Sequence, residues 1–332
     1  MTQKTLNQLI IDFIEFSELE RGLFPSTTEK YHYRLKRFLK WAKRELKTAP
    51  LKPVDITEDL VKEFRLYLNR YINPVTRRGL KASTQNHYVV ALRAFLKYLA
   101  RTGIACVPPE RVELRRSDSH SLKFLALEQL EQLLRQSDTT KIRGLRDRAM
   151  MELLFSTGLR VSEMTGLNRK DVNSKSQEFS VIGKGGRVRL VFISDRAKKW
   201  VQEYLNRRRD AWEPLFISHS GTRRSKGSKS DESSSGDIKD YIEDPSGEKF
   251  RLSVRSVQRI IKKCARQAGL AIDVTPHVMR HTFATDLLTS GADIRSVQEL
   301  LGHKNISTTQ IYTHVTNPRL REVYKRFHGK SG

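Results

Sequence analysis

Apolar side chains in the first hundred residues recur every three or four positions, a spacing that lines one face of a helix. The first segment shows the pattern at five positions: Leu6, Leu9, Ile10, Phe13 and Ile14. Three more segments repeat it over about 25–41, 57–68 and 84–99, and each begins with residues typical of helix starts. Four amphipathic helices predict a small helical bundle over residues 1–106.

Residues 107–121 break this periodicity with two prolines and several charges (VPPERVELRRSDSHS). Proline and charge without apolar spacing are typical of a connection between domains. We therefore predict a linker here, followed by a second domain over 122–332.

The second domain mixes two periodicities. A helical segment over 145–155 ends at Gly158, and two short apolar runs, 179–182 and 188–193, flank the turn Gly183-Lys184-Gly185-Gly186. Such a turn predicts a β-hairpin. Helices are predicted again over four segments: 195–208, 253–268, 275–291 and 292–301. The fold class is thus mainly α with a small β-hairpin, in an N-terminal four-helix domain and a mixed α/β domain.

Two further segments of this domain are distinctive. Residues 219–248 contain eight Ser and four Gly with few apolar residues, which predicts a mobile insertion. The last amphipathic piece, 318–328, predicts a helix whose apolar face packs either on its own domain or on a neighbouring copy.

Composition excludes several classes of protein. The chain has 332 residues and 38% hydrophobic residues, enough for packed cores. No stretch approaches the ~18 apolar residues of a membrane span, and the N-terminus does not resemble a secretory signal. Two cysteines, Cys106 and Cys264, suggest neither a disulfide framework nor a zinc site. We therefore expect a cytoplasmic protein without a membrane partner.

The net charge of the chain indicates what kind of ligand it binds. The formal net charge is +25, and Lys and Arg exceed Asp and Glu on both sides of residue 116. Two basic domains are typical of a protein that binds a polyanion, above all nucleic acid. A merely solvated, lysine-rich surface is the alternative.

Several residues are candidates for chemistry at phosphate, although each has an ordinary structural explanation. Arg160 follows a helix end, with Glu163 three residues later to hold its guanidinium. Lys184 stands at the hairpin tip, where it could reach a phosphate or only promote solubility. His277 and Arg280 share one face at the start of a helix. His277 and His281 have a zinc-like spacing, but the HExxH glutamate is missing.

His303 and Tyr312 complete the candidates, in LLGH and TTQIYTH. In order, Arg160, Lys184, His277-x-x-Arg280, His303 and Tyr312 resemble the tyrosine recombinase (phage-integrase-like) family. The flanking sequences TGLRVSE, VIGKGGRVR, TPHVMRHTFAT and LLGHKNISTTQIYTHV are similar too. The closing TNPRLREVYKRFH resembles Xer-type members in particular, and the N-terminal bundle resembles the family's core-binding domain.

The resemblance implies a mechanism. Tyr312 would attack a DNA phosphate to give a 3′-phosphotyrosyl bond, and Lys184 would protonate the leaving 5′-oxygen. Arg160, Arg280 and His303 would stabilise the charge, His277 would accept the tyrosine proton, and Glu163 would orient Arg160. Because the covalent bond conserves the phosphodiester energy, we expect no cofactor, no metal and no ATP.

The resemblance also implies partners. Double-stranded DNA with a specific site would lie in a C-shaped clamp, in a synapse of four copies or of two different recombinases, with an activating protein as a further candidate. Additional DNA contacts are expected from Arg77, Arg78 and Lys81, in the basic turn NPVTRRGLKAS, and from Arg187. The role would be chromosome-dimer resolution in the nucleoid or mobile-element integration. Topoisomerase IB-like DNA relaxation and DNA binding without catalysis are the alternatives.

Overall fold

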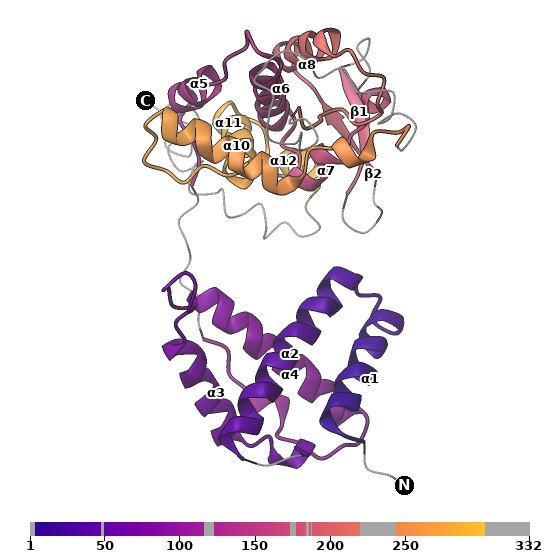
Figure 1. Ribbon diagram of the computed structural model, residues 1–332, viewed down its shortest axis with the longest axis vertical. Coiled ribbons are helices and arrows are strands. Elements are labelled where there is room, and N and C mark those ends of the chain that lie inside the picture. The colour runs from indigo at the N-terminus through magenta and orange to yellow at the C-terminus, as the bar shows by residue number, and fades with distance from the viewer. Residues whose placement is uncertain are drawn as a thin grey trace, which may run out of the picture. The chain divides into compact units, whose positions relative to one another are not determined.

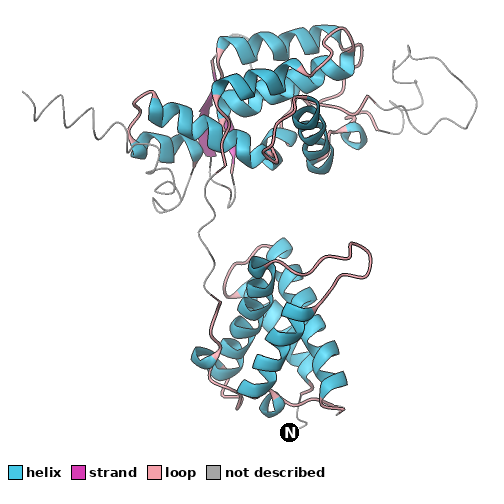
Figure 2. Cartoon of the chain, turned by 90° about the vertical axis from the view of Figure 1, so that its left-hand side faces the viewer, coloured by secondary structure: helices cyan, strands magenta, loops and turns pink. Residues whose placement is uncertain are grey.

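The structure is a computed structural model of the whole chain. It describes residues 4–47, 50–115, 123–172, 177–183, 186, 188–219 and 244–302. The chain divides into two compact units, Met1–His120 and Ser121–Gly332. Helices dominate both units, and the two strands belong to the second (Figure 2).

The first unit is a bundle of α1 (Leu6–Leu19), α2 (Pro25–Glu45), α3 (Glu58–Arg70) and α4 (Ala82–Arg101) (Figure 1). Threonine side chains cap two of these helices, Thr5 by accepting from Gln8 N and Thr57 by accepting from Leu60 N. The predicted apolar faces meet in one core, where Phe13 packs edge-on against Phe95. The predicted four-helix bundle is confirmed.

Residues 107–115 differ from the linker predicted over 107–121, because they pack on the first unit. They include a short 3-10 helix, Pro109–Arg111, and Val112 is buried in the bundle core. Arg111 forms an ion pair with Glu58. Apolar anchors at single positions, without helical spacing, hold this segment in place.

In the second unit, two long helices, α6 (Ile142–Thr157) and α11 (Pro276–Thr289), pack against each other. Around them lie α5 (Leu127–Arg135), α7 (Val161–Thr165), α8 (Asp195–Arg207), α10 (Val254–Gln267) and α12 (Ile294–Leu301). Both long helices bury residues on several faces, as expected of central helices. The short helices α5 and α7 were not among the predicted elements.

The predicted hairpin consists of β1 (Glu178–Ile182) and β2 (Val188–Phe192), which pair antiparallel. Val181 lies opposite Arg189, and Ile182 opposite Val188. The inward positions Phe179, Val181 and Val191 join the core. Lys184 and Arg187 of the turn lie outside the described residues.

The two ends of the serine-rich segment are joined to each other. Ser218 N donates to Phe250 O at 2.7 Å, and Leu252 N donates to Phe216 O at 2.9 Å. Trp212 stacks on Phe250, with ring centroids 4.1 Å apart. The described residues on either side of this segment therefore lie at one place on the core. Residues 220–243 and the predicted helix 318–328 lie outside the described residues.

Candidate active site

The active-site candidates begin where α6 stops. Gly158 ends α6 in the left-handed conformation, with φ 58°. An added Cβ there would lie 2.4 Å from the Phe283 ring, so both the turn and the close approach require glycine. Arg160 then caps α7, and its backbone N–H donates to Glu163 Oε2 at 2.9 Å. The local fold thereby fixes Arg160 beside Glu163, as the sequence predicted.

The Glu163 carboxylate binds two guanidinium groups. Arg160 Nη1 donates to Oε1 at 2.9 Å, and Arg189 Nη1 and Nη2 donate to Oε1 and Oε2 at 2.9 and 2.8 Å. The exposed fraction of the side chain is 29% for Arg160, 11% for Arg189 and 5% for Glu163. Arg160 is thus the member of this group that solvent, or a ligand, can reach.

Burial alone would raise the pKa of Glu163, but hydrogen bonds from Arg189 and from the backbone and side chain of Arg160 lower it to about 2. Glu163 is therefore ionised at any physiological pH. Its negative charge holds the two arginines together, and it does not serve as a proton donor or acceptor near neutral pH.

Arg280 is buried on α11, three residues after His277. Its Nη1 donates to Gly158 O and its Nη2 to Leu301 O, both at 2.6 Å. These carbonyls end α6 and α12, where the helix dipole is negative and favours a cation. Arg280 therefore ties three helices together at the site, and Gly158 connects it directly to the segment that carries Arg160.

His277 is exposed at the start of α11, which Thr275 caps and Pro276 opens. Partial desolvation and the charges of Arg280 and Arg160 lower the pKa of His277 below its usual value. The imidazole is therefore neutral at pH 7 and can accept a proton. Burial, His277 and Arg280 likewise lower the pKa of His281.

The structure thus brings together Arg160, Glu163, His277 and Arg280 of the predicted site. Lys184, Arg187, His303 and Tyr312 lie outside the described residues. The described chain ends at Gly302, whose carbonyl lies 3.4 Å from Arg160 Nη2. The cluster contains three guanidinium groups, two of them bound to Glu163 and the third, Arg280, bound to backbone carbonyls. Positive charge is therefore in excess, and the cluster suits an anion such as a phosphate.

Sequence reasoning missed Arg189. The signal was available: strand alternation places Arg189 on the inward side of β2 with Val191, whereas Val188, Leu190 and Phe192 are exposed. A mostly buried arginine on the inward face of a strand requires hydrogen-bonding partners, of which a carboxylate is the strongest. Glu163 is that partner.

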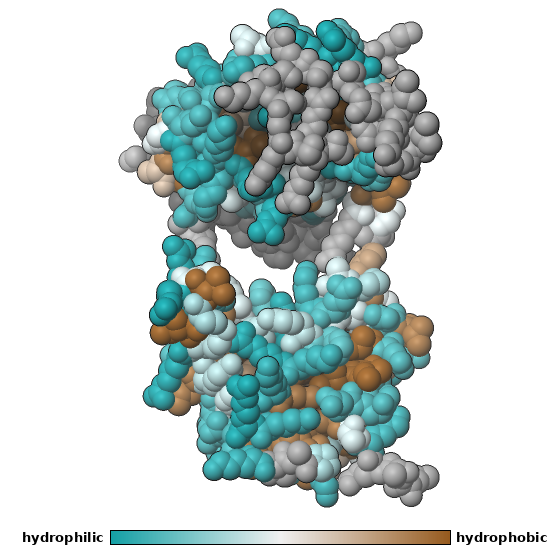
Figure 3. Space-filling model, in the orientation of Figure 1, coloured by the Kyte–Doolittle hydropathy of each residue, from teal (hydrophilic) through white to brown (hydrophobic). Residues whose placement is uncertain are grey.

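The first unit carries its own basic features. Asn73 Oδ1 accepts from the backbone N–H groups of Val75 and Thr76, which shapes the predicted basic turn. Arg77 adopts a positive φ of 54°, and Arg77, Arg78 and Lys81 are exposed. On the face of this unit shown in Figure 3, hydrophilic and hydrophobic residues are intermixed.

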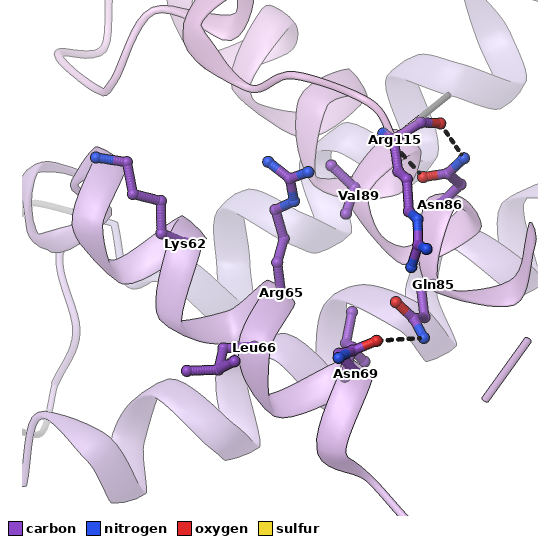
Figure 4. Close-up of a pocket in the computed structure, with 9 residues that line it drawn as sticks. Lys62, Arg65, Leu66, Asn69, Gln85, Asn86, Val89 and Arg115 are labelled. Carbon is purple, nitrogen blue, oxygen red and sulfur yellow. Dashed lines mark hydrogen bonds between the residues drawn. The ribbon is translucent and has the colours of Figure 1, made fainter. Parts of the chain in front are cut away.

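A pocket of about 360 Å³ in this unit lies between α3 and α4 (Figure 4). Three cationic side chains line it: Lys62, Arg65 and Arg115. Amide side chains lie beside them, and Asn86 exchanges two hydrogen bonds with the backbone of Arg115, at 2.7 and 3.2 Å. Cations beside amides are typical of nucleic-acid contacts.

Among the described residues, no group of three or more His, Cys, Asp or Glu could hold a metal ion. No described helix is long and apolar enough to cross a membrane.

Comparison with known families decides the class of the protein. The protein-family model described as "Phage integrase family" matches residues 123–319, more than half of the chain. The chain belongs to the phage integrase family. A second model of the same family, "Phage integrase, N-terminal SAM-like domain", matches residues 10–103.

Curated relatives in this family are Xer-type tyrosine recombinases. Tyrosine recombinase XerD of Listeria monocytogenes is 33% identical over 98% of this chain and 100% of its own length. Tyrosine recombinase XerC of Pelobacter propionicus is 35% identical over 95% of this chain and 93% of its own. The predicted class, a tyrosine-type enzyme that breaks and rejoins DNA strands, is confirmed. It is favoured over the topoisomerase-like and non-catalytic alternatives.

Solved structures support the fold of a phage integrase. The Tn1549 transposon integrase in complex with transposon right-end DNA aligns with a TM-score of 0.67 and 22% identity, over 98% of this chain and 100% of that chain. The XerH recombinase bound to its difH substrate aligns with a TM-score of 0.63 and 20% identity, over 96% and 83%.

Proposed function

We propose that this chain recombines duplex DNA at a specific site, with Tyr312 as the nucleophile and with Arg160 and Arg280 as the ligands of the scissile phosphate. The observation that carries the proposal is the linkage of the two arginines through Gly158, beside the neutral His277. Both guanidinium groups are held before any ligand arrives, so stabilising a phosphorane-like charge requires little reorganisation.

The steps balance without an external energy source. The phenolic oxygen of Tyr312 attacks phosphorus while His277 accepts its proton. The bond from phosphorus to the 5′-oxygen breaks, and Lys184 donates a proton to that oxygen. Arg160, Arg280 and His303 stabilise the charge on the non-bridging oxygens. A 5′-hydroxyl from the partner strand then reverses these steps and releases Tyr312.

The proposal extends to the assembly. Two basic units that both bind duplex DNA would account for the charge of +25. Four copies, or two kinds of recombinase, would pair two DNA sites on the chromosome, and in the mixed assembly an activating protein would start the exchange. Arg77, Arg78, Lys81 and Arg187 would contact the phosphate backbone. The Xer-type relatives, matched over nearly the full chain, support a role in chromosome-dimer resolution.

A covalent trap tests the nucleophile. The protein is mixed with nicked duplexes from a library of recombination-like sites, denatured in SDS, and the attached DNA is sequenced. We expect attachment that Tyr312→Phe abolishes and that the matched Tyr324→Phe retains, because only one phenol becomes the leaving group of the rejoining step. Attachment that survives Tyr312→Phe would show that the nucleophile is another residue.

The same preparation separates the alternatives. Relaxation of supercoiled DNA without exchange between two sites would favour the topoisomerase-like activity. Tight duplex binding without any covalent product would favour a non-catalytic DNA-binding protein.

A further inference from the structure

Arg189 differs from the other arginines of the cluster in how it uses its nitrogens. Nη1 and Nη2 bind the two oxygens of Glu163 at 2.9 and 2.8 Å, and Nε donates to Leu300 O at 3.3 Å. All three nitrogens therefore donate to groups of the protein. The edge formed by Nη1 and Nη2 is taken by Glu163 and Nε is taken by Leu300 O, so Arg189 has no free edge to offer a phosphate.

Arg160 shares the same carboxylate but keeps most of its hydrogen-bonding capacity. Its Nη1 binds Glu163, and its Nη2 reaches only a long contact of 3.4 Å with Gly302 O. A guanidinium group has five N–H donors in a planar fork, so several remain for a ligand. The two arginines are chemically identical, and their contacts alone distinguish them.

Glu163 is the acceptor for which they compete. Its two oxygens receive four donors, two from Arg189 and two from Arg160, counting the backbone N–H. A carboxylate has about four lone-pair sites, so this one is saturated. If Arg189 were absent, two sites would open beside Arg160, whose fork forms a bidentate pair with a carboxylate readily.

We propose that Arg189 is a positioning residue for DNA cleavage: by occupying both oxygens of Glu163, it restricts Arg160 to a single side-chain bond with Glu163 and leaves the rest of that guanidinium for the scissile phosphate. The inference rests on the proposed role of Arg160. Arg189 also maintains the excess of positive charge, since Glu163 would otherwise neutralise Arg160 alone.

Two more contacts show that this place in the fold is built around Arg189. A Cβ added to Gly302 would lie 2.9 Å from Arg189 Cδ, so the end of α12 approaches the side chain as closely as glycine allows. The bond to Leu300 O holds that same helix end. Arg189 thus joins β2, α7 and α12 at one point.

The test is a double-mutant cycle on single-turnover covalent attachment to a nicked duplex at saturating DNA. We expect Arg189→Leu to slow attachment about 10–100-fold, by analogy with the loss of a hydrogen-bond partner that orients a metal-binding side chain. Affinity for the duplex should change little, because the contact that Arg160 loses is one that stabilises the transition state more than the bound ground state. Adding Glu163→Gln should restore much of the rate, since the amide oxygen can still accept one hydrogen bond from Arg160 but cannot form a bidentate pair with it or neutralise its charge.

Arg148→Leu is the matched control. Arg148 is equally buried, with 11% of its side chain exposed, and pairs with the buried Glu152 on α6. Its loss should lower the melting temperature without slowing attachment. If Arg189→Leu does not fold, Arg189→Gln takes its place, because it removes the charge but keeps one amide donor. We expect it to slow attachment about tenfold, with the same partial recovery by Glu163→Gln.

Three results would overturn the inference: a wild-type rate in the neutral Arg189 variant, a double variant no faster than the single one, or a rate loss that Arg148→Leu reproduces. Each leaves attachment by the wild type, and hence the proposed function, intact. No attachment by the wild type, or attachment by Tyr312→Phe, would instead refute the proposed function and this inference with it.

Discussion

The arginines of the candidate active site, in the second unit, are held by hydrogen bonds, whereas those of the basic turn, in the first unit, are exposed. Arg280 is 5% exposed and is held by two backbone carbonyls at 2.6 Å. In the basic turn, Asn73 fixes the backbone, while the side chains of Arg77 and Arg78 extend into solvent. Arginine is thus fixed by hydrogen bonds in the candidate active site and exposed to solvent in the basic turn.

We expect these two groups of arginines to affect different quantities, the rate of DNA cleavage and the affinity for DNA. A guanidinium that folding has already fixed can stabilise charge as it develops, without reorganisation, so its loss should lower the rate of the bound complex. An exposed guanidinium attracts any phosphate and is screened by salt, so its loss should weaken binding at every sequence. Substitutions of Arg280 and of the basic turn, described below, test this division.

The largest effect is expected from Arg280→Lys. Lysine keeps the charge, but its compact ammonium cannot bind Gly158 O and Leu301 O while also presenting a planar edge to phosphate. We expect single-turnover attachment to slow about 10²–10³-fold, with duplex affinity within about threefold of wild type. Rapid-quench kinetics at saturating DNA and a binding titration measure the two quantities.

The control for this variant is Arg146→Lys, a buried arginine of the same unit that pairs with Asp147 and Ile217 O. It should leave the rate of attachment unchanged. A parallel loss of rate and affinity in Arg280→Lys would mean that Arg280 binds the ground state and transition state equally, contrary to the comparison.

A smaller effect, on the free energy of unfolding, is expected from the titration of His219. This residue is buried in the second unit, and its Nε2 lies 3.0 Å from Tyr204 Oη. Burial, and then the charges of Arg146 and Arg208, lower the pKa of His219 to about 3, although Asp210 opposes them. In the unfolded chain the pKa is about 6.5, so between about pH 6.5 and pH 3 the unfolded state binds more protons.

The free energy of unfolding should therefore decrease as pH falls below about 6.5, by up to about 1.4 kcal/mol per pH unit from this group. Urea unfolding at about pH 7 and about pH 5 measures the slope. His219→Gln can still bond Tyr204 but does not titrate, so its slope should be shallower. An equal slope in both proteins would refute the assignment to His219.

The sequence predicted the four helices α1 to α4 of the first unit, and α6, α8, α10, α11 and α12 of the second, because their apolar faces have regular spacing and clear ends. Gly158 stops α6 and Thr275 with Pro276 opens α11, as expected. It also predicted the pairing of Arg160 with Glu163, because a spacing of three residues brings side chains together on a single turn.

What the sequence did not predict depends on contacts between distant segments. Arg189 meets Glu163 across 26 positions, and Arg280 meets Gly158 across 122. Sequence patterns that extend over only a few residues do not reveal contacts between positions so far apart. The helix α5 was missed for a different reason: it is short, although Leu130, Leu133 and Leu134 are buried and follow helical spacing.

The smallest effect is expected from substitutions in the basic turn, whose exposed arginines should affect affinity for DNA and not the rate of cleavage. Replacing Arg77 and Arg78 with Gln should weaken duplex binding at specific and unrelated sequences alike. The slope of log affinity against log salt should fall by about one for each phosphate that these cations neutralise in the wild type. Attachment at saturating DNA should keep its rate, because these side chains are not among those proposed to bind the scissile phosphate.

Lys52→Gln is the matched control for the basic turn, since Lys52 is exposed in the connection before α3, whereas the basic turn follows α3. It should leave both the affinity and the salt slope unchanged. An unchanged salt slope in the Arg77 and Arg78 variant would show that exposure and charge alone do not identify a DNA contact in this unit. The cationic pocket between α3 and α4 would then be the better candidate for the first unit's hold on DNA.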